Sequence, residues 1–396
     1  MKRSLAVAAI LAALVLAACD TAADPSVAPS VEPTPSVTPP PAAPTQTPDP
    51  TPEPSVAPTP PTDVAYAPAT VPETENSTAA TIVVPGGEGL VAIGFNGGFG
   101  SILWTSGDGG RTWTDITPAD FASIGIASVV EYDGMLVGVG RGNTIDVDAQ
   151  EAAVYLSDDG VTWRKVTKAE DMLGQLIDVV VTDDGLFAIG GVVGADAAGV
   201  WHSADAENWE RIGGDFEHAF LWSIAEGGPG LVAVGWRRNP DPDLSVWTSA
   251  DAGVTWDLAP DPEGFAGFEA TDVAALPDGS LAMVGSAFDG SGGRFWRSTD
   301  GVAWSLVMET DGAWPRTLAS TPIGLVAAGS AGEMLGGAWV STDGLAWSPL
   351  GEPVEGAFFT GIHATDEGIL FGGATQAGTF ETGIQAHAAI WLATFD

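Results

Sequence analysis

The residues best suited to chemistry in this chain are a few arginines that stand beside tryptophans. Trp236-Arg237-Arg238 is the densest basic segment in a chain of 13 Lys and Arg against 52 Asp and Glu, and Trp314-Pro315-Arg316 is similar. An arginine binds a carboxylate through two parallel N–H groups, and a neighbouring aromatic ring adds a stacking surface. These types suit an acidic sugar or another carboxylate. The candidate ligand-binding residues are Arg141, Trp236, Arg237, Arg238, Arg294, Trp314 and Arg316.

These arginines also have acidic neighbours in the sequence, with which they could form structural ion pairs instead of binding a ligand. Asp241 and Asp243 follow Arg238 closely, and an ion pair with either one would occupy a guanidinium that a ligand could otherwise use. Because the chain holds 52 acidic residues, such a pairing is the commoner outcome for each arginine taken alone.

Other kinds of chemistry find little support, and no catalytic residue is assigned. The four histidines, His202, His218, His363 and His387, lack metal-ligand spacing. The chain has no Gly-x-Ser-x-Gly elbow and no phosphate loop. Acidic pairs such as Asp146 with Asp148 or Asp241 with Asp243 would suit Ca²⁺, but neither matches an EF-hand loop. We therefore predict no cofactor and no metal, with Ca²⁺ as a weak alternative.

Composition excludes several classes of protein. The net charge of −39 argues against nucleic-acid binding and against docking on an anionic membrane by charge. The single cysteine excludes a disulfide framework and a cysteine-based zinc site. With 45% hydrophobic and only 16% charged residues, the chain is able to bury a sizeable core.

The N-terminal segment has the features of a targeting signal. Lys2 and Arg3 precede an apolar run from Leu5 to Ala18 that is too short to span a membrane and fits a signal peptide. The run ends in Leu16-Ala17-Ala18-Cys19, which resembles a bacterial lipobox; the alternative is a plain signal peptide. The resemblance implies cleavage before Cys19 and a lipid anchor on it. We therefore expect a bacterial surface lipoprotein, extracytoplasmic and held at the membrane through its N-terminus alone.

A low-complexity segment follows the expected anchor. Residues 20–76 hold 17 of the 29 prolines, eight acids and no Lys or Arg. Such a composition cannot bury enough apolar surface to fold, and its prolines favour an extended polyproline II conformation. The predicted organisation is a signal peptide over 1–18, a disordered stalk over 19–61 and a folded domain over 62–396.

The rest of the chain repeats a short apolar strand that begins with glycine. The leading glycines are spaced 45, 51, 45, 49, 45 and 44 residues apart. Repeats of about 40–50 residues built from short strands are typical of β-propeller blades. The sequence therefore predicts an all-β fold, a seven-bladed β-propeller of four-stranded blades. The leading glycines are Gly89, Gly134, Gly185, Gly230, Gly279, Gly324 and Gly368.

A second motif follows six of these strands and reads Ser-x-Asp-(x)-Gly-x-Thr-Trp in its fullest form. The Ser and Asp side chains suit a tight turn because they hydrogen-bond nearby backbone amides, and the Trp suits the apolar layer between sheets. Twelve of the fifteen tryptophans fall in this column or in one just before the motif, once Trp391 of the last repeat is counted, so we expect them in the core. The motif residues are Ser106, Asp108, Gly110, Trp113, Ser157, Asp159, Trp163, Ser203, Asp205, Trp209, Ser249, Asp251, Gly253, Trp256, Ser298, Asp300, Trp304, Ser341, Asp343 and Trp347.

These six copies resemble the Asp box, or BNR repeat, of sialidase-like propellers. The resemblance covers residues 79 to 396 and implies that the box acids are structural and lie on the outer rim of the face opposite the ligand. It further implies that Trp236, Trp314 and the candidate arginines lie in loops of the ligand face. The seventh blade ends early, at Asp396, and Pro61-Thr62-Asp63-Val64-Ala65-Tyr66 is the candidate for its missing outer strand.

Two functions remain open. Sialidases place three arginines on the substrate carboxylate, use a tyrosine nucleophile and carry an Arg-Ile-Pro motif before the first box. This chain has no arginine between Arg3 and Arg111, and Tyr66, Tyr132 and Tyr155 are poorly placed as nucleophiles. We therefore expect a monomeric binding or scaffold module that recognises a glycan or a protein partner, and no nucleic acid. The alternative is a glycoside hydrolase, which would need two carboxylates about 5–5.5 Å apart if it retains configuration.

Overall fold

The computed structural model describes residues 61, 63–72, 77–87, 89–96, 100–142, 151–166, 174–192, 197–214, 216–238, 241–260, 264–377 and 385–395. The chain divides into two compact units, Met1–Ser55 and Val56–Asp396, and the described residues belong to the second. The predicted signal peptide, Cys19 and nearly all of the predicted stalk lie outside them. No helix in the described part of the chain is long and apolar enough to cross a membrane.

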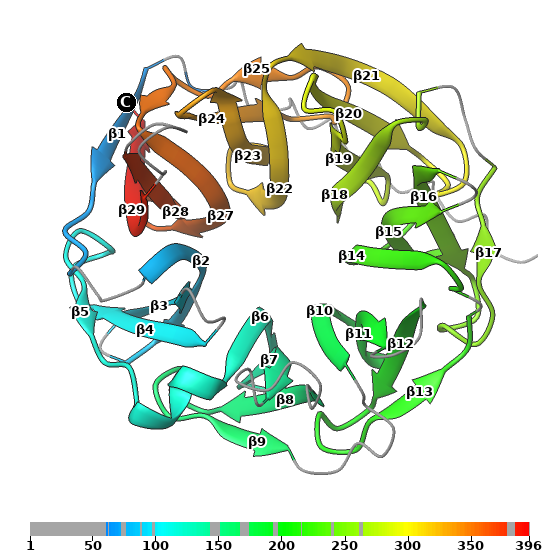
Figure 1. The fold of residues 1–396 in the computed structure, drawn as a ribbon, viewed down its shortest axis with the longest axis horizontal. Helices are drawn as coiled ribbons and strands as arrows, with labels where there is room; N and C mark the ends of the chain where they lie inside the picture. The colour runs from blue at the N-terminus through cyan, green and yellow to red at the C-terminus, as the bar shows by residue number, and fades with distance from the viewer. Residues whose placement is uncertain are drawn as a thin grey trace, which may run out of the picture. The chain divides into compact units, whose positions relative to one another are not determined.

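The second unit is a ring of seven antiparallel sheets, the blades (Figure 1), and this confirms the predicted propeller. The innermost strands of blades one to seven are β2 (Ser77–Gly86), β6 (Gly125–Tyr132), β10 (Gly174–Thr182), β14 (Ala219–Gly227), β18 (Phe268–Ala275), β22 (Trp314–Thr321) and β27 (Ala357–Thr365). The second strands are β3 (Gly89–Asn96), β7 (Met135–Gly142), β11 (Gly185–Val192), β15 (Gly230–Arg238), β19 (Leu281–Ala287), β23 (Gly324–Gly332) and β28 (Gly368–Ala377).

The outer half of each blade completes the four-stranded pattern. The third strands are β4 (Ser101–Ser106), β8 (Glu151–Ser157), β12 (Ala198–Ser203), β16 (Pro242–Ser249), β20 (Gly292–Ser298), β24 (Leu335–Ser341) and β29 (Gln385–Phe395). The outermost strands of blades one to six are β5 (Thr114–Asp115), β9 (Arg164–Val166), β13 (Glu210–Ile212), β17 (Asp257–Leu258), β21 (Trp304–Asp311) and β25 (Ser348–Pro349). A 3₁₀ turn, η1 (Ala119–Ser123), joins blades one and two, and β26 (Val354–Glu355) pairs with β24.

The outermost strand of blade seven comes from the opposite end of the folded chain. β1 (Val64–Pro68) pairs antiparallel with β29, with Tyr66 opposite Ala393. This segment is the one that the sequence predicts for ring closure. The pairing covers the edge that β29 would otherwise expose to other chains.

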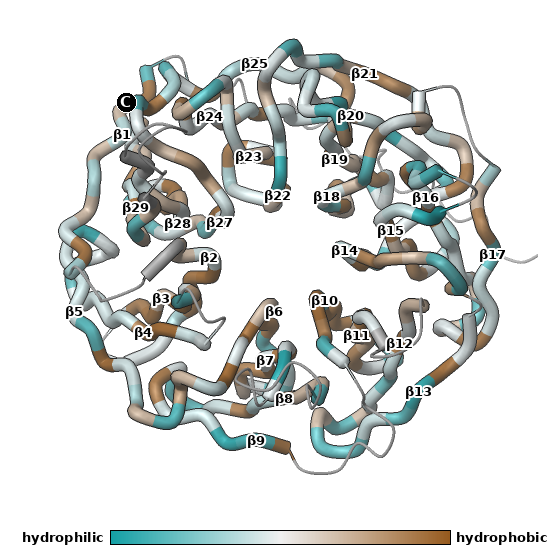
Figure 2. Tube along the Cα trace, in the orientation of Figure 1, coloured by the Kyte–Doolittle hydropathy of each residue, from teal (hydrophilic) through white to brown (hydrophobic). Residues whose placement is uncertain are grey.

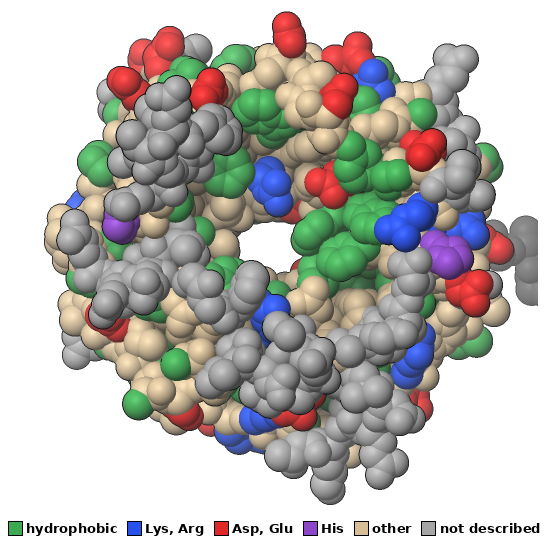
Figure 3. Space-filling view, viewed as in Figure 1, with side chains coloured by type: hydrophobic (Ala, Val, Ile, Leu, Met, Phe, Trp, Pro, Cys, Tyr) green, Lys and Arg blue, Asp and Glu red, His purple; other side chains and the backbone are tan. Residues whose placement is uncertain are grey.

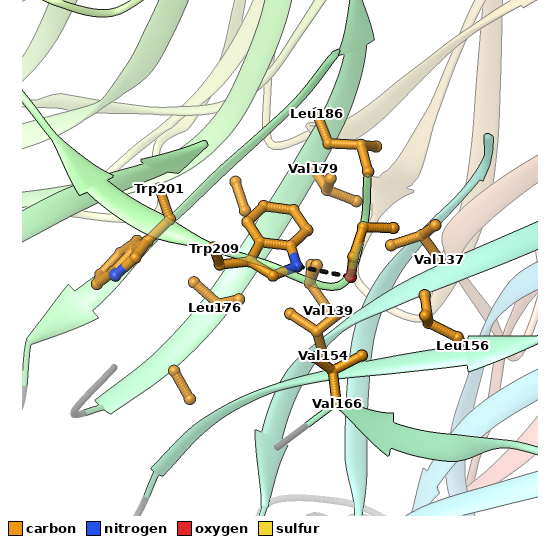
Figure 4. Packing of buried hydrophobic residues seen from close by; sticks show 13 residues of the cluster. Val137, Val139, Val154, Leu156, Val166, Leu176, Val179, Leu186, Trp201 and Trp209 are labelled. Atoms are coloured by element: carbon orange, nitrogen blue, oxygen red, sulfur yellow. Dashed lines mark hydrogen bonds between the residues drawn. The ribbon is translucent and has the colours of Figure 1, made fainter. Parts of the chain in front are cut away.

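The core is divided among the seven interfaces between blades. Each of seven apolar clusters joins residues of two neighbouring blades, and the cluster of Ala80, Trp104, Leu370 and Leu392 closes the ring between blades one and seven. Figure 2 shows apolar segments within the blades and hydrophilic segments in many of the connecting turns. Figure 4 shows the interface of blades two and three, where Trp209 lies among aliphatic side chains.

Candidate functional site

The innermost strands enclose a central channel with a volume of 930 Å³. Each of these strands has a β-bulge at the same point of the repeat, where one residue has no partner on the second strand. A bulge re-aims a side chain, and all seven bulged residues line the channel. Only two of them, Trp222 and Arg316, carry large polar or aromatic side chains. The bulged residues are Thr81, Ala127, Ile177, Trp222, Thr271, Arg316 and Thr360.

The predicted ligand-binding residues share one edge of the blades, and two of them, Arg141 and Arg316, line the channel itself. Arg141, Trp236, Arg237 and Arg238 stand at the ends of second strands. Arg294, Trp314 and Arg316 stand near the beginnings of third or innermost strands. Because neighbouring strands run antiparallel, all of these positions lie at one edge of the blades. The Asp-box turns follow third strands and therefore lie at the opposite edge.

The Asp-box turns share one hydrogen-bond pattern. In blade one, Gly110 N–H donates to Ser106 Oγ (3.0 Å) and Thr112 N–H donates to Asp108 Oδ1 (2.9 Å). The hydrogen bonds from Thr112 are the largest cause that lowers the pKa of Asp108 to about 2. In all six copies the indole Nε1 of the box Trp donates to a turn carbonyl at 2.8–3.2 Å. Figure 4 shows this bond for Trp209. The box acids are thus held by the turn itself, as in a structural role.

An aromatic row runs along blade four toward the channel. We define it as Trp236, Phe220 and Trp222. The rings of Phe220 and Trp236 are nearly parallel, with centroids 6.1 Å apart, and those of Phe220 and Trp222 are tilted at 4.6 Å. Trp222 Nε1 donates to Glu269 Oε2 of blade five at 3.1 Å. All three side chains are half-buried. Figure 3 shows hydrophobic side chains gathered beside the channel on the side of β14, with basic side chains next to them.

The candidate arginines differ in their partners. Arg294 is occupied: its Nε donates to Glu309 Oε1 at 2.7 Å and its Nη1 to the Gly264 carbonyl at 2.7 Å. Arg238 lies over the Trp236 ring, 5.8 Å from its centroid. Arg316 lies over Phe358, at 5.9 Å. Within the described residues, neither Arg237 nor Arg316 contacts a carboxylate, which leaves these two guanidinium groups available for an anionic group.

Arg141 lines the same channel from blade two, near the end of β7. Its Nη1 donates to Gln175 Oε1 at 3.5 Å, and burial lowers the pKa of its guanidinium. Its carbonyl accepts a hydrogen bond from the hydroxyl of Tyr155, which occupies the buried tryptophan column of blade two. Blades two and three therefore line the channel with polar groups, and the aromatic row of blade four comes next in the ring.

Two carboxylates, Asp178 and Asp272, also line the channel, one residue beyond the bulges of blades three and five. Asp178 accepts hydrogen bonds from Ser128 Oγ (2.8 Å), Val179 N–H (2.9 Å) and Ile224 N–H (3.0 Å). Asp272 accepts from Ser223 Oγ (2.7 Å), Val273 N–H (2.8 Å) and Leu318 N–H (2.7 Å). Each of the four carboxylate oxygens therefore accepts at least one hydrogen bond from the channel wall. Burial raises the pKa of both groups, that of Asp272 to about 7.

Known proteins add the following. No protein-family model matches the chain, and no curated protein matches it either. The chain is similar to a crystal structure of a protein of unknown function from Dyadobacter fermentans, at 14% identity, over 84% of this chain and 99% of that one, with a TM-score of 0.49. The seven-bladed fold is established by the strand pairing of this chain alone.

The structure corrects one expectation about the candidate residues. They were expected in loops, but they belong to strands: Arg237 pairs with Asp243, Trp236 with Leu244 and Trp314 with Ser330. The hairpins at this edge of the blades are longer than the sequence repeat predicts, so these backbones are held by ladder hydrogen bonds. Arg141 and Arg294 likewise lie within β7 and β20, and Arg316 within β22.

The acidic residues named as alternative partners of the arginines or of Ca²⁺ lie as follows. Asp243 does not pair with Arg237 through its side chain; its Oδ1 accepts a hydrogen bond from Gly267 N–H at 3.0 Å. Asp146 and Asp148 lie outside the described residues. In the described part of the chain, no three His, Cys, Asp or Glu side chains are grouped closely enough to hold a metal ion.

Several residues that line the channel were not predicted from the sequence. Trp222 stands outside both tryptophan columns, which was a signal, but its place at a bulge could not be derived from the repeat period. Phe220 and Gln175 carry no motif. Ser128, Asp178, Ser223 and Asp272 occupy one equivalent position of successive blades, a pattern that emerges only when the blades are aligned by their bulges.

Proposed function

We propose that this protein is a binding propeller that recognises a glycan or a protein partner at the channel mouth carrying the aromatic row. One observation supports this most strongly: the half-buried row Trp236–Phe220–Trp222 lies on the same edge as Arg237 and Arg316, two cations without a carboxylate partner among the described residues. Partly exposed aromatic rings with arginines are typical of interface residues that contribute most of a binding energy.

The chemistry of this mouth favours a ligand with both an apolar face and an anionic group. The rings supply apolar contact area, and the arginines supply paired N–H donors for a carboxylate. Phe288, at the same edge, is 45% exposed and widens the apolar surface. The folded domain from residue 77 onward carries 44 acids against 11 Lys and Arg, so a polyanion is repelled while a single acidic group is not.

The proposed address is the outer face of a bacterial membrane, through lipidated Cys19 and the Pro-rich stalk. Support comes from the sequence Leu16-Ala17-Ala18-Cys19 and from the proline content of residues 20–76. Expression of the full chain with a labelled lipid precursor tests the anchor. The label should appear on the wild type and be lost in Cys19→Ser; equal labelling of both would refute it.

The binding function is tested by presenting the full chain to a glycan array and to a library of cell-surface proteins. Trp222→Ala should weaken an identified interaction by about 30-fold and Arg316→Ala by about 10-fold, as expected for interface anchors. Arg164→Ala and Val254→Ala are matched controls at the Asp-box edge, where Val254 is 63% exposed. Equal loss in the controls, or full retention in both site variants, would reject this mouth as the binding site.

A glycoside hydrolase is the second candidate, because Asp178 and Asp272 line the same channel as Arg141. A raised pKa is the property of a general acid. However, each oxygen of the two carboxylates already accepts at least one hydrogen bond from the channel wall, so both groups are engaged in holding the wall together. Turnover of an aryl glycoside that is lost in both Asp178→Asn and Asp272→Asn would favour this candidate over binding alone.

A further inference from the structure

The strand that carries Phe220 and Trp222 is held from both sides by carboxylates. Asp178 of β10 accepts the backbone N–H of Ile224, and Asp272 of β18 accepts the hydroxyl of Ser223. Ser223 directly follows Trp222. Two acidic side chains of the flanking blades therefore bond the two residues that directly follow Trp222 in β14.

These contacts continue into the next blades and form a chain of hydrogen bonds. We call Ser128, Asp178, Ser223 and Asp272 the carboxylate bridge. Ser128 of β6 donates to Asp178, and Leu318 N–H of β22 donates to Asp272. The bridge thus ties five successive innermost strands together, and β14, with its aromatic row, is the middle one. In blades one and seven the equivalent positions are Ile82 and Gly361, which cannot continue it.

The bridge places two acidic groups close together in a poorly solvated wall. The charge of Asp178 adds to burial in raising the pKa of Asp272, and the Ser223 hydroxyl acts in the opposite direction on both groups. The other charged or titratable groups that line the channel are Arg141, Arg316 and His363, and Glu269 lies on the same strand as Asp272. None of the four hydrogen-bonds either carboxylate among the described contacts.

We propose that the carboxylate bridge is a proton-dependent latch that positions the aromatic row: the bridge holds one proton, and loss of that proton loosens β14 and shifts Trp222. Two like charges across one serine repel each other, and desolvation strengthens that repulsion. The protonated bridge carries one negative charge, which the surrounding N–H and O–H donors stabilise. Asp178 and Asp272 act here as positioning residues for Trp222.

The latch is tested by the tryptophan emission of the full chain from about pH 4 to pH 9, with Trp222→Phe subtracted to isolate Trp222. The wild type should show a transition with a midpoint near neutral pH, and Asp272→Asn should abolish it. Asp178→Asn should lower the midpoint by about one unit because it removes the neighbouring charge, whereas Ser223→Ala should raise it. Asp278→Asn is the control: this exposed carboxylate bonds Ser280 and Arg297 and is not part of the bridge.

Several outcomes would overturn the latch. They are a wild type without a transition in this range, a transition that survives in Asp272→Asn, or one that Asp278→Asn removes. If Asp272→Asn does not fold, the other two variants test the proposal. The midpoint of the emission transition should then shift in opposite directions in Asp178→Asn and Ser223→Ala, and equal midpoints in both would refute the proposal.

The effect of the latch on a ligand rests on the proposed function, whereas the emission transition does not. Affinity for a ligand found on the arrays should fall above the midpoint in the wild type and stay constant in Asp272→Asn. A clear emission transition with pH-independent affinity would reject the aromatic row as the binding site and leave the latch standing. The absence of both changes would reject the latch.

Discussion

The hydroxyl of Tyr66 donates a hydrogen bond to the carbonyl of Leu350, and this contact joins the first strand of the folded domain to blade six. The Tyr66 ring packs against Phe359 and Phe371 of blade seven, with centroids 5.8 Å and 5.5 Å away. Burial raises the pKa of the Tyr66 hydroxyl. β1 thus closes the ring through a side chain that spans two blades as well as through its pairing with β29.

Tyr66 should therefore contribute to stability through two separable terms. Tyr66→Phe removes only the hydroxyl and should lower the free energy of unfolding by about 1 kcal/mol. Tyr66→Ala also removes the aromatic contacts and should cost about 3 kcal/mol. Urea unfolding of the full chain measures both. Tyr132→Phe is the control, since its hydroxyl bonds the Ala204 carbonyl at an exposed site and should matter less. Equal effects of Tyr66→Phe and Tyr66→Ala would contradict a packing role.

The backbone of the fourth Asp-box turn is strained at Ala252, and a substitution could relieve this strain. Ala252 has φ of 55°, a left-handed conformation that residues with a Cβ resist, and the equivalent residue of the first box is Gly109, at φ 72°. Ala252 is exposed, so its methyl group contributes little packing. Ala252→Gly should therefore stabilise the protein by about 1 kcal/mol, measured by thermal or urea unfolding.

Ala206 provides the contrast for that prediction. It also has a positive φ, of 60°, but its methyl group is fully buried in the interface of blades two and three. Ala206→Gly relieves the same strain and loses about 0.8 kcal/mol of buried methyl, so its net effect should be near zero. A larger gain from Ala206→Gly than from Ala252→Gly would show that backbone strain does not explain these two sites.

The free energy of unfolding should reach a maximum at mildly acidic pH and fall on either side of it. The box acids, such as Asp108, have lowered pKa values in the folded state, so the stability they contribute is present above about pH 4 and is lost below it. Asp272 has a raised pKa of about 7, so the folded state binds more protons than the unfolded chain between about pH 4 and pH 7. Stability from this group therefore falls as pH rises through that window, by at most about 4 kcal/mol.

The free energy of unfolding, measured by urea titration from about pH 2 to pH 8, should be highest near pH 4–5. Asp272→Asn should remove the decrease in stability above the pH of the maximum and leave the decrease at lower pH unchanged. A wild-type stability that keeps rising between about pH 5 and pH 7 would contradict the assigned protonation of Asp272.

The sequence was sufficient to predict the blades and insufficient to predict the candidate site, for physical reasons. Strand type, period and the Asp-box turns are local, so Gly89-led strands and Trp columns predict seven blades directly. The availability of an arginine depends on neighbouring strands. Arg294 is occupied because β21, the outermost strand of blade five, is long enough to bring Glu309 beside it, and the repeat period does not encode that length. Trp222 faces the channel because of a β-bulge, and no turn-forming residue in the sequence indicates where that bulge lies.

The bulge that presents Trp222 requires a glycine at the facing position of the second strand, and this requirement can be tested. A Cβ placed on Gly235 would lie 1.9 Å from the carbonyl oxygen of Phe220, at the start of the bulge that presents Trp222. The oxygen belongs to the backbone, so it cannot move aside without breaking the pairing of β14 with β15. Gly235→Ala should therefore cost at least about 3 kcal/mol of stability and alter the emission of Trp222. Gly191 is the matched control in β11, since nothing lies within 4 Å of its added Cβ, and Gly191→Ala should be nearly neutral. Urea unfolding compares the two alanine variants; similar stabilities would mean that the glycine of the second strand does not shape the bulge, and that Trp222 faces the channel for some other reason.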